Sequence, residues 1–175
     1  MNNTKKLTLC ALFLALGLIL PFFTGQIPEI GNMLLPMHLP VLICGFICGW
    51  KYGLILGFIT PLFRMMIFGM PPLPKAMGMA FELAVYGAVT GFLYERLPSF
   101  KGKNYVCLLS AMLLGRIVWG IVSIFIYGMN DMPFGLQIFI AEAFINAIPG
   151  IILQIVLIPL LILALEKSGV LKKND

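Results

Sequence analysis

Charged residues are scarce in this chain of 175 residues, and their scarcity excludes a soluble domain. Only 11% of the residues are charged, while 61% are hydrophobic, and the mean hydropathy is +1.02. A soluble domain carries roughly a quarter charged residues, so the sequence predicts an integral membrane protein. The net charge of +5 does not indicate nucleic-acid binding, because the basic residues lie in loops rather than in a stripe.

The residues that most membrane enzymes need are also missing. The chain has one histidine, His38, and it precedes Cys48 by ten residues, about 15 Å along a helix, so we expect no compact zinc site. Neither Ser110 nor Ser123 has a supporting catalytic constellation. No GxxxxGK loop is present, so the chain is not expected to hydrolyse ATP itself. The sequence therefore predicts no enzyme, no metal and no cofactor.

Cysteine is rare as well, and its placement implies no disulfide framework. The four cysteines lie in or beside apolar runs. Cys44 and Cys48 are four residues apart on a predicted helix, and we interpret them as small packing residues rather than as ligands.

What the chain does contain is six apolar segments, which predict a single all-α membrane domain over residues 1–175 with six transmembrane helices. Their approximate bounds are 7–24, 36–49, 52–68, 76–94, 105–127 and 134–165. The last segment is longer than a bilayer requires. Pro149 and Pro159 are therefore expected to kink it, unless its end lies along the membrane surface.

The basic residues orient the bundle. With the termini inside, nine lysines and arginines lie in inner loops or tails, and Lys75 alone lies outside. This positive-inside bias predicts that both termini are cytoplasmic.

Glycines organise the hairpin from Pro36 to Arg64. They recur every four residues at Gly45, Gly49, Gly53 and Gly57, with Gly49–Gly53 expected as a short turn. Faces without side chains allow helix backbones to approach closely in lipid. The hairpin ends in an arginine inside an apolar segment, which is costly in hydrocarbon and should face a partner or a ligand.

Four helices send ionisable groups to a similar depth. At a rise of about 1.5 Å per residue, Arg64, Glu82, Arg116 and Glu142 all fall near the middle or in the outer half of the membrane. Internal salt bridges are one interpretation, yet buried pairs seldom exceed apolar packing in stability. A polar pocket for a small charged or zwitterionic solute explains the layer better. Its candidate contacts are Arg64, Glu82, Tyr86, Arg116, Trp119, Glu142, Asn146 and His38.

The hairpin residues PMHLPVLICGFICG (36–49), then Tyr52-Gly53, Gly57-Phe58 and PLFR (61–64), resemble those of the substrate-binding S components of energy-coupling factor (ECF) vitamin transporters. The resemblance extends over the size, the six helices, the inside termini and the small residues Ala11 and Ala15 on the first helix. A stand-alone secondary carrier, or an intramembrane enzyme, is the alternative. A channel fits less well, because no continuous selectivity lining is evident.

The resemblance implies a multi-pass protein of the bacterial cytoplasmic membrane that takes up a vitamin or a precursor. Ala11 and Ala15 would dock on a transmembrane coupling subunit driven by two cytoplasmic ATPases, which hydrolyse the ATP. The ligand would lie under the loops at residues 25–35, 69–75 and 128–133.

The residues allow only a ranking of ligands. The arginines and Lys75 suit a carboxylate such as pantothenate, which we favour. Glu82 and Glu142 would suit an amine or a cationic ring, as in thiamine precursors. Trp119, Tyr86 and Phe81 would suit a flat heterocycle, such as a flavin, a folate or a queuosine precursor.

Overall fold

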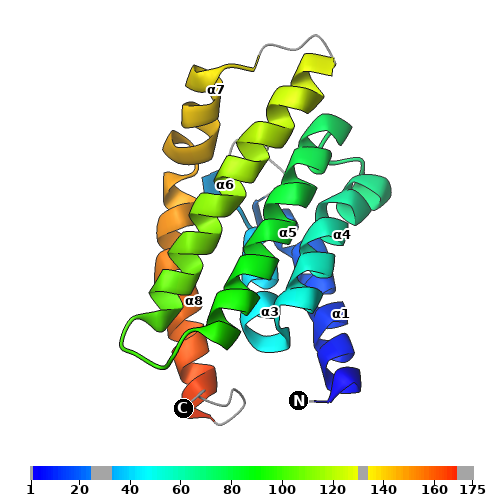
Figure 1. Ribbon diagram of the computed structural model, residues 1–175. Coiled ribbons are helices and arrows are strands. Elements are labelled where there is room, and N and C mark those ends of the chain that lie inside the picture. The colour runs from blue at the N-terminus through cyan, green and yellow to red at the C-terminus, as the bar shows by residue number, and fades with distance from the viewer. Residues whose placement is uncertain (1, 25–32, 130–133, 169–175) are drawn as a thin grey trace.

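The computed structural model describes residues 2–24, 33–129 and 134–168, and its regular elements in these ranges are all helical (Figure 1). The loop residues 25–32 and 130–133, on which two of the expected ligand-covering loops fall, lie outside the described part. In chain order the elements are α1 (Asn3–Ile19), η1 (Leu20–Thr24), α3 (His38–Cys48), α4 (Trp50–Phe68), α5 (Leu73–Arg96), α6 (Lys103–Met129), α7 (Leu136–Ile140), η2 (Ala141–Ile145) and α8 (Ile148–Lys167).

The predicted all-helical membrane bundle is confirmed. Within the described ranges, five helical stretches are long and apolar enough to cross a membrane, and α3 is a shorter apolar helix of 11 residues. Large apolar side chains such as Phe125, Val156 and Leu160 are exposed on the outer faces of α6 and α8, as lipid-facing residues are. The start of α1 and the end of α8 lie at the same end of the bundle (Figure 1). We call this the inner end, since the positive-inside rule predicts that it faces the cytoplasm, and the opposite end the outer end.

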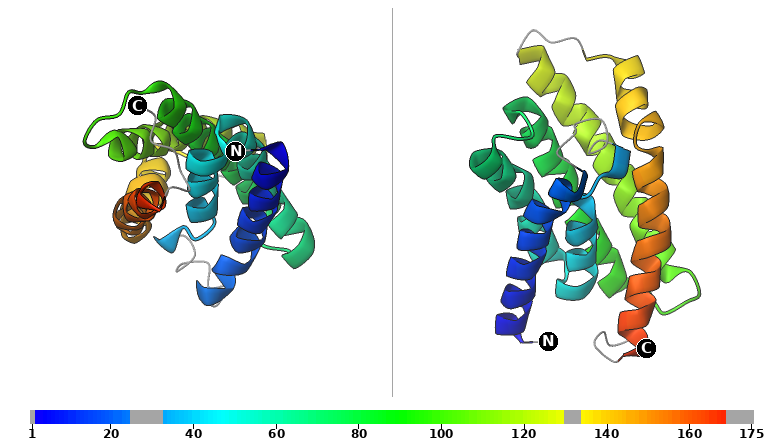
Figure 2. Two further views of the ribbon diagram at one scale, coloured as in Figure 1. Left: turned by 90° about the horizontal axis from the view of Figure 1, so that it is seen from below. Right: turned by 180° about the vertical axis from the view of Figure 1, so that it is seen from behind.

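Helix α5 is the centre of the bundle, because it packs against α3, α4 and α6. Helix α1 covers α3 and α4, while α8 packs against α3 and α6, so α1 and α8 stand on different sides of the bundle (Figure 2). One apolar core cluster joins α3, α5, α6 and α8 around Leu42, Tyr86 and Ile158. A second joins α1, α3, α4 and α5 around Phe13, Val41 and Leu83.

Glycines permit the close approach of α3, α4 and α5. A Cβ atom on Gly53 would lie 2.5 Å from the carbonyl oxygen of Gly87, and one on Gly45 would lie 2.6 Å from the same oxygen. The predicted close-packing role of these glycines is therefore confirmed, with α5 as the partner. The expected turn at Gly49–Gly53 is wrong in extent, because only Gly49 interrupts the helices. Its φ of 92° is a conformation that glycine adopts without strain.

The long C-terminal segment is broken at its outer part rather than continuous. Residues Ala141–Ile145 form a π-helical turn in which the backbone N–H of Asn146 donates to the Ala141 carbonyl at 2.8 Å. Pro149 follows at the start of α8, and its missing N–H removes a bond that a continuous helix would require. Pro159 lies inside α8 without ending it. The break therefore occurs at the first of the two predicted prolines.

Candidate functional site

A buried ion pair connects the two longest helices of the bundle. Glu82 on α5 and Arg116 on α6 are only 2% and 5% exposed, and Arg116 Nη1 lies 3.0 Å from Glu82 Oε1. The close approach of α6 to α5 beside Arg116 depends on Gly115, because a side chain there would have no room against the Tyr86 ring. Two oppositely charged groups predicted at one depth are thus in direct contact.

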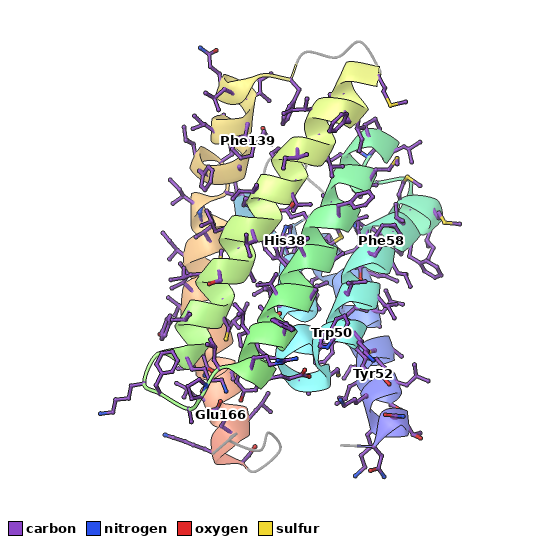
Figure 3. The ribbon with its side chains drawn as sticks, in the orientation of Figure 1. His38, Trp50, Tyr52, Phe58, Phe139 and Glu166 are labelled. Atoms are coloured by element: carbon purple, nitrogen blue, oxygen red, sulfur yellow. The ribbon has the colours of Figure 1, made fainter. Side chains whose placement is uncertain are left out.

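His38 brings a third helix to this pair. It lies in the first turn of α3, is 1% exposed, and its Nε2 is 3.5 Å from Glu82 Oε1. Its imidazole packs edge-on against the Tyr86 ring, with ring centroids 5.3 Å apart. Figure 3 shows His38 among the helices near the middle of the bundle. We call His38, Glu82, Tyr86 and Arg116 the buried polar cluster.

The cluster has more hydrogen-bonding capacity than its own members use. Among the described residues, no hydrogen bond of normal geometry is made by His38 Nδ1, by the Tyr86 hydroxyl, or by Arg116 Nε and Nη2. All of these atoms are buried, and buried polar atoms in proteins are nearly always paired. The cluster is therefore chemically suited to receive a polar group.

Gln154 on α8 is a polar residue that the sequence reasoning missed. It is 0% exposed, and within the described ranges neither atom of its amide has a hydrogen-bond partner. The inner ends of α5, α6 and α8 are Arg96, Lys103 and Lys167. Glu82, Arg116 and Gln154 lie at nearly equal distances from these ends, each along its own helix. At about 1.5 Å per residue, all three side chains stand about 20 Å above the inner end. The sequence signal that could have identified Gln154 is a single polar amide within an otherwise apolar helix.

Aromatic rings lie on the outer side of the cluster. Trp119 follows Arg116 by almost one turn of α6 and stacks on Phe139 of α7, with centroids 6.0 Å apart. Phe134 contacts Trp119 edge-on at 5.6 Å and stacks on Tyr127 at 5.3 Å. These contacts hold α7 and the adjoining Phe134 against α6.

The two other predicted contacts on that segment pair with each other. Asn146 Nδ2 donates to Glu142 Oε1 at 3.1 Å, and the pair is much less buried than Glu82 and Arg116, with Glu142 half-buried and Asn146 exposed. Glu142 lies within electrostatic range of Lys75 and Arg116. The pair is therefore peripheral to the buried polar cluster.

Arg64 has its contacts elsewhere. Its guanidinium donates to the carbonyl of Leu18 on α1 and lies beside the rings of Phe22 and Phe68, 5.0 and 5.3 Å from their centroids. These contacts connect α4 to α1, and those of Arg116 connect α6 to α5. The two arginines that the sequence places at similar depth thus have different surroundings, and the site proposed below does not use the ligand contact predicted for Arg64.

The two alanines proposed for docking lie on the outer face of α1. Ala11 and Ala15 are exposed, while Phe13 and Gly17 on the same helix are buried. Gly17 packs on α4, where a Cβ atom would lie 2.7 Å from Thr60 Cγ2. The small face of α1 therefore points away from the bundle.

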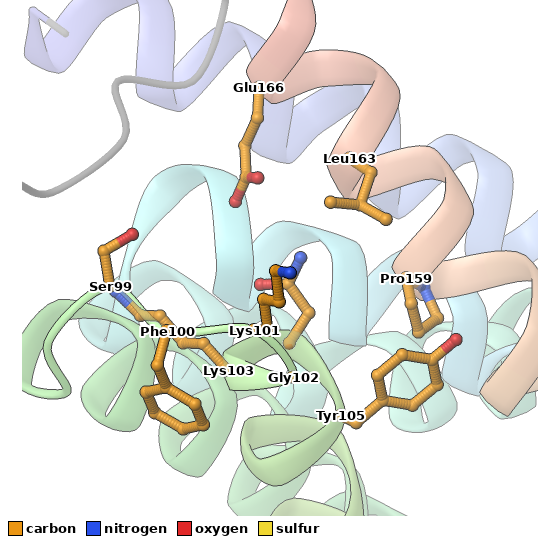
Figure 4. Close-up of a pocket in the computed structure, with 10 residues that line it drawn as sticks. Ser99, Phe100, Lys101, Gly102, Lys103, Tyr105, Pro159, Leu163 and Glu166 are labelled. Carbon is orange, nitrogen blue, oxygen red and sulfur yellow. The ribbon is translucent and has the colours of Figure 1, made fainter.

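A separate hollow of about 370 Å³ opens at the inner end, between the α5–α6 loop and α8 (Figure 4). Lys101, Lys103 and Glu166 line it with Pro159 and Leu163. The Tyr94 hydroxyl donates to Glu166 Oε1 at 2.7 Å, and Lys103 Nζ lies 4.5 Å from the centroid of the Tyr94 ring. No member of the buried polar cluster lines this hollow.

A comparison with protein families finds one match over most of the chain. The family described as "ECF transporter, substrate-specific component" matches residues 5–162. No curated protein and no solved structure gives a match.

Proposed function

The chain belongs to the family of ECF transporter substrate-specific components, and on that premise we propose that it binds a small vitamin or precursor bearing a carboxylate. Pantothenate is the ligand that we favour, and the buried polar cluster is the proposed site. The substrate-binding roles of the predicted residues other than Arg64 are part of this proposal, as is their place in one membrane domain, residues 1–175. Arg64 lies outside the proposed site.

The free edge of Arg116 is the observation that carries the proposal. Nη1 faces Glu82, while Nε and Nη2, which share the other edge of the guanidinium, make no hydrogen bond of normal geometry within the described residues. That edge suits a carboxylate, because two parallel N–H groups match its two oxygens. Glu82 keeps Arg116 in place and neutralises it, so the site does not hold an isolated buried charge in the absence of ligand.

The remaining groups suit the rest of such a molecule. Pantothenate carries an amide and two hydroxyls, and the Tyr86 hydroxyl, His38 Nδ1 and the Gln154 amide are buried groups able to pair with them. A flat heterocycle is less well served, because Trp119 already stacks on Phe139. Glu142 and Asn146 are proposed as contacts nearer the outer mouth.

Delivery into the cell is proposed to require partners. The exposed small face at Ala11 and Ala15 is suited to the close approach of helices from a transmembrane coupling subunit. Two cytoplasmic ATPase subunits would supply the energy, and the assembly would reside in the bacterial cytoplasmic membrane. On this proposal the chain alone binds its ligand and does not accumulate it.

Calorimetry on the purified protein tests the site, with pantothenate and with its alcohol analogue, which lacks the carboxylate. Two charge-assisted hydrogen bonds contribute about 1.5–3 kcal/mol each, and about 1.4 kcal/mol is tenfold in affinity. The analogue should therefore bind at least about 100-fold more weakly, and Arg116→Gln should cause a similar loss for pantothenate. Native mass spectrometry would first identify any molecule that copurifies.

Arg64→Gln is the matched control, because it removes a second intramembrane guanidinium outside the cluster. It should leave the affinity nearly unchanged. Equal losses in both variants, or equal binding of pantothenate and its alcohol, would contradict the carboxylate site. ATP-independent accumulation by the lone protein in liposomes would contradict the need for partners.

A further inference from the structure

Three of the four cysteines meet at the interface of α1 and α3. The sulfur atoms of Cys10, Cys44 and Cys48 all lie within 4.8 Å of one another, and the Cys10 and Cys44 sulfurs are 3.5 Å apart. Cys44 and Cys48 are buried at 0% and 1% exposure, and Cys10 is half-buried. Sequence spacing groups only the two cysteines on α3, and packing against α1 brings in the third.

The sulfur positions match those of a thiolate metal centre. With metal–sulfur bonds of about 2.3 Å, three ligands stand roughly 3.8 Å apart in tetrahedral geometry and about 4.0 Å apart in trigonal geometry. Small side-chain rotations would bring the three sulfurs to these separations. Thiolates are soft ligands that select ions such as Zn²⁺ and Cu(I).

The surroundings favour a divalent ion. Cys48 ends α3 near the inner end, and its sulfur lies 3.8 Å from the Lys6 carbonyl oxygen. A Cβ atom on the adjoining Gly49 would lie 3.9 Å from Lys6 Nζ and in contact with the Glu95 carboxylate. Three thiolates and a divalent ion carry a net charge of −1, which the Lys6 ammonium would offset in apolar surroundings, while the neighbouring Glu95 side chain is exposed. Lys6 and Glu95 also form a polar edge through which an ion can enter from the cytoplasm.

We propose that Cys10, Cys44 and Cys48 form a binding site for one soft divalent d¹⁰ cation, such as Zn²⁺ or Cd²⁺. The reducing cytosol keeps these thiols available. Binding forms three sulfur–metal bonds and releases the three thiol protons, with no change in oxidation state. The Lys6 carbonyl oxygen or a solvent molecule would complete a tetrahedron. Bound metal would join α1 to α3 beside Ala11, on the helix that carries the proposed docking face.

Cadmium titration of the reduced, full-length protein tests this site, because cadmium–thiolate bonds give a near-ultraviolet charge-transfer band. We expect saturation at one ion per chain, protection of three thiols from alkylation, and competition by Zn²⁺. Cys10→Ala, Cys44→Ala and Cys48→Ala should each weaken binding more than about 100-fold, since even changes beyond the ligands cost roughly 10- to 100-fold.

Cys107→Ala is the matched control. Cys107 is also buried, but lies on α6 in the other core cluster, so its loss should leave the titration unchanged. Thermal unfolding separates folding defects from binding defects, because the ion should raise the Tm of the wild type and of Cys107→Ala, and should not raise the Tm of the other variants. Absence of saturable binding, or equal binding by Cys44→Ala and the wild type, would overturn the proposal.

Discussion

Replacing Glu82 by Gln should destabilise this protein far more than replacing Glu142 by Gln. Both are glutamates that sequence depth places in the same layer of the membrane. Glu82 is 2% exposed and lies 3.0 Å from Arg116 and 3.5 Å from His38. Glu142 is half-buried on the π-helical segment and accepts a hydrogen bond from Asn146. Only the first substitution leaves a buried guanidinium without its counter-charge.

The expected difference follows from burial. Removing one partner of a buried ion pair costs about 3–5 kcal/mol. For a chain of this size each kcal/mol shifts the Tm by about 2–4 °C, so Glu82→Gln should lower the Tm by roughly 6–20 °C. Glu142→Gln retains an oxygen acceptor for Asn146 and loses only a partly solvated charge, so its effect should stay below about 1 kcal/mol.

Thermal unfolding of the purified, ligand-free protein in detergent provides the measurement. Tryptophan emission reports on the site, because Trp119 lies almost one turn from Arg116. The double variant Glu82→Gln/Arg116→Gln should recover part of the lost stability, since it removes both charges of one pair. Equal losses for Glu82→Gln and Glu142→Gln, or a double variant less stable than either single one, would refute the assignment of the buried pair.

Three further predictions concern other parts of the bundle. Gln154→Leu should raise the stability of the ligand-free protein by about 1–3 kcal/mol, because it removes an unsatisfied buried amide. The same substitution should weaken pantothenate binding, because the amide is a proposed ligand contact. A less stable protein with unchanged affinity would contradict both the unsatisfied state of the amide and its contact with ligand. Gly53→Ala should cost about 1–3 kcal/mol by overpacking against Gly87, whereas Gly128→Ala, which has open space around its Cα, should cost nothing in the same unfolding assay. Ala11→Leu/Ala15→Leu should block uptake by the complete transporter in vesicles, while calorimetry should show unchanged ligand affinity. Ala164→Leu, on the exposed face of α8, is the control. Normal uptake by the double variant would exclude docking through the small face of α1.

The sequence by itself determined the membrane class, the helical segments and the depth of the interior charges. These features depend on local quantities, namely hydropathy over a helix length and a constant rise of about 1.5 Å per residue. The glycines at Gly45 and Gly53 also predicted close helix contact, since a missing side chain is visible in the sequence. The prolines limited where the last segment breaks, but they did not predict a π-helical turn.

Tertiary structure alone decided which interior groups meet. Arg64 and Arg116 stand at similar depth, yet Arg116 on α6 faces Glu82 on α5, while Arg64 lies beside the rings of Phe22 and Phe68. Gln154 reaches the level of the buried polar cluster from a helix far along the chain, and Cys10 joins two cysteines of a different helix. Depth fixes only one coordinate of a side chain in a membrane. The other two depend on how each helix is rotated and on which neighbours its small residues admit, and those are set by packing between segments distant in sequence.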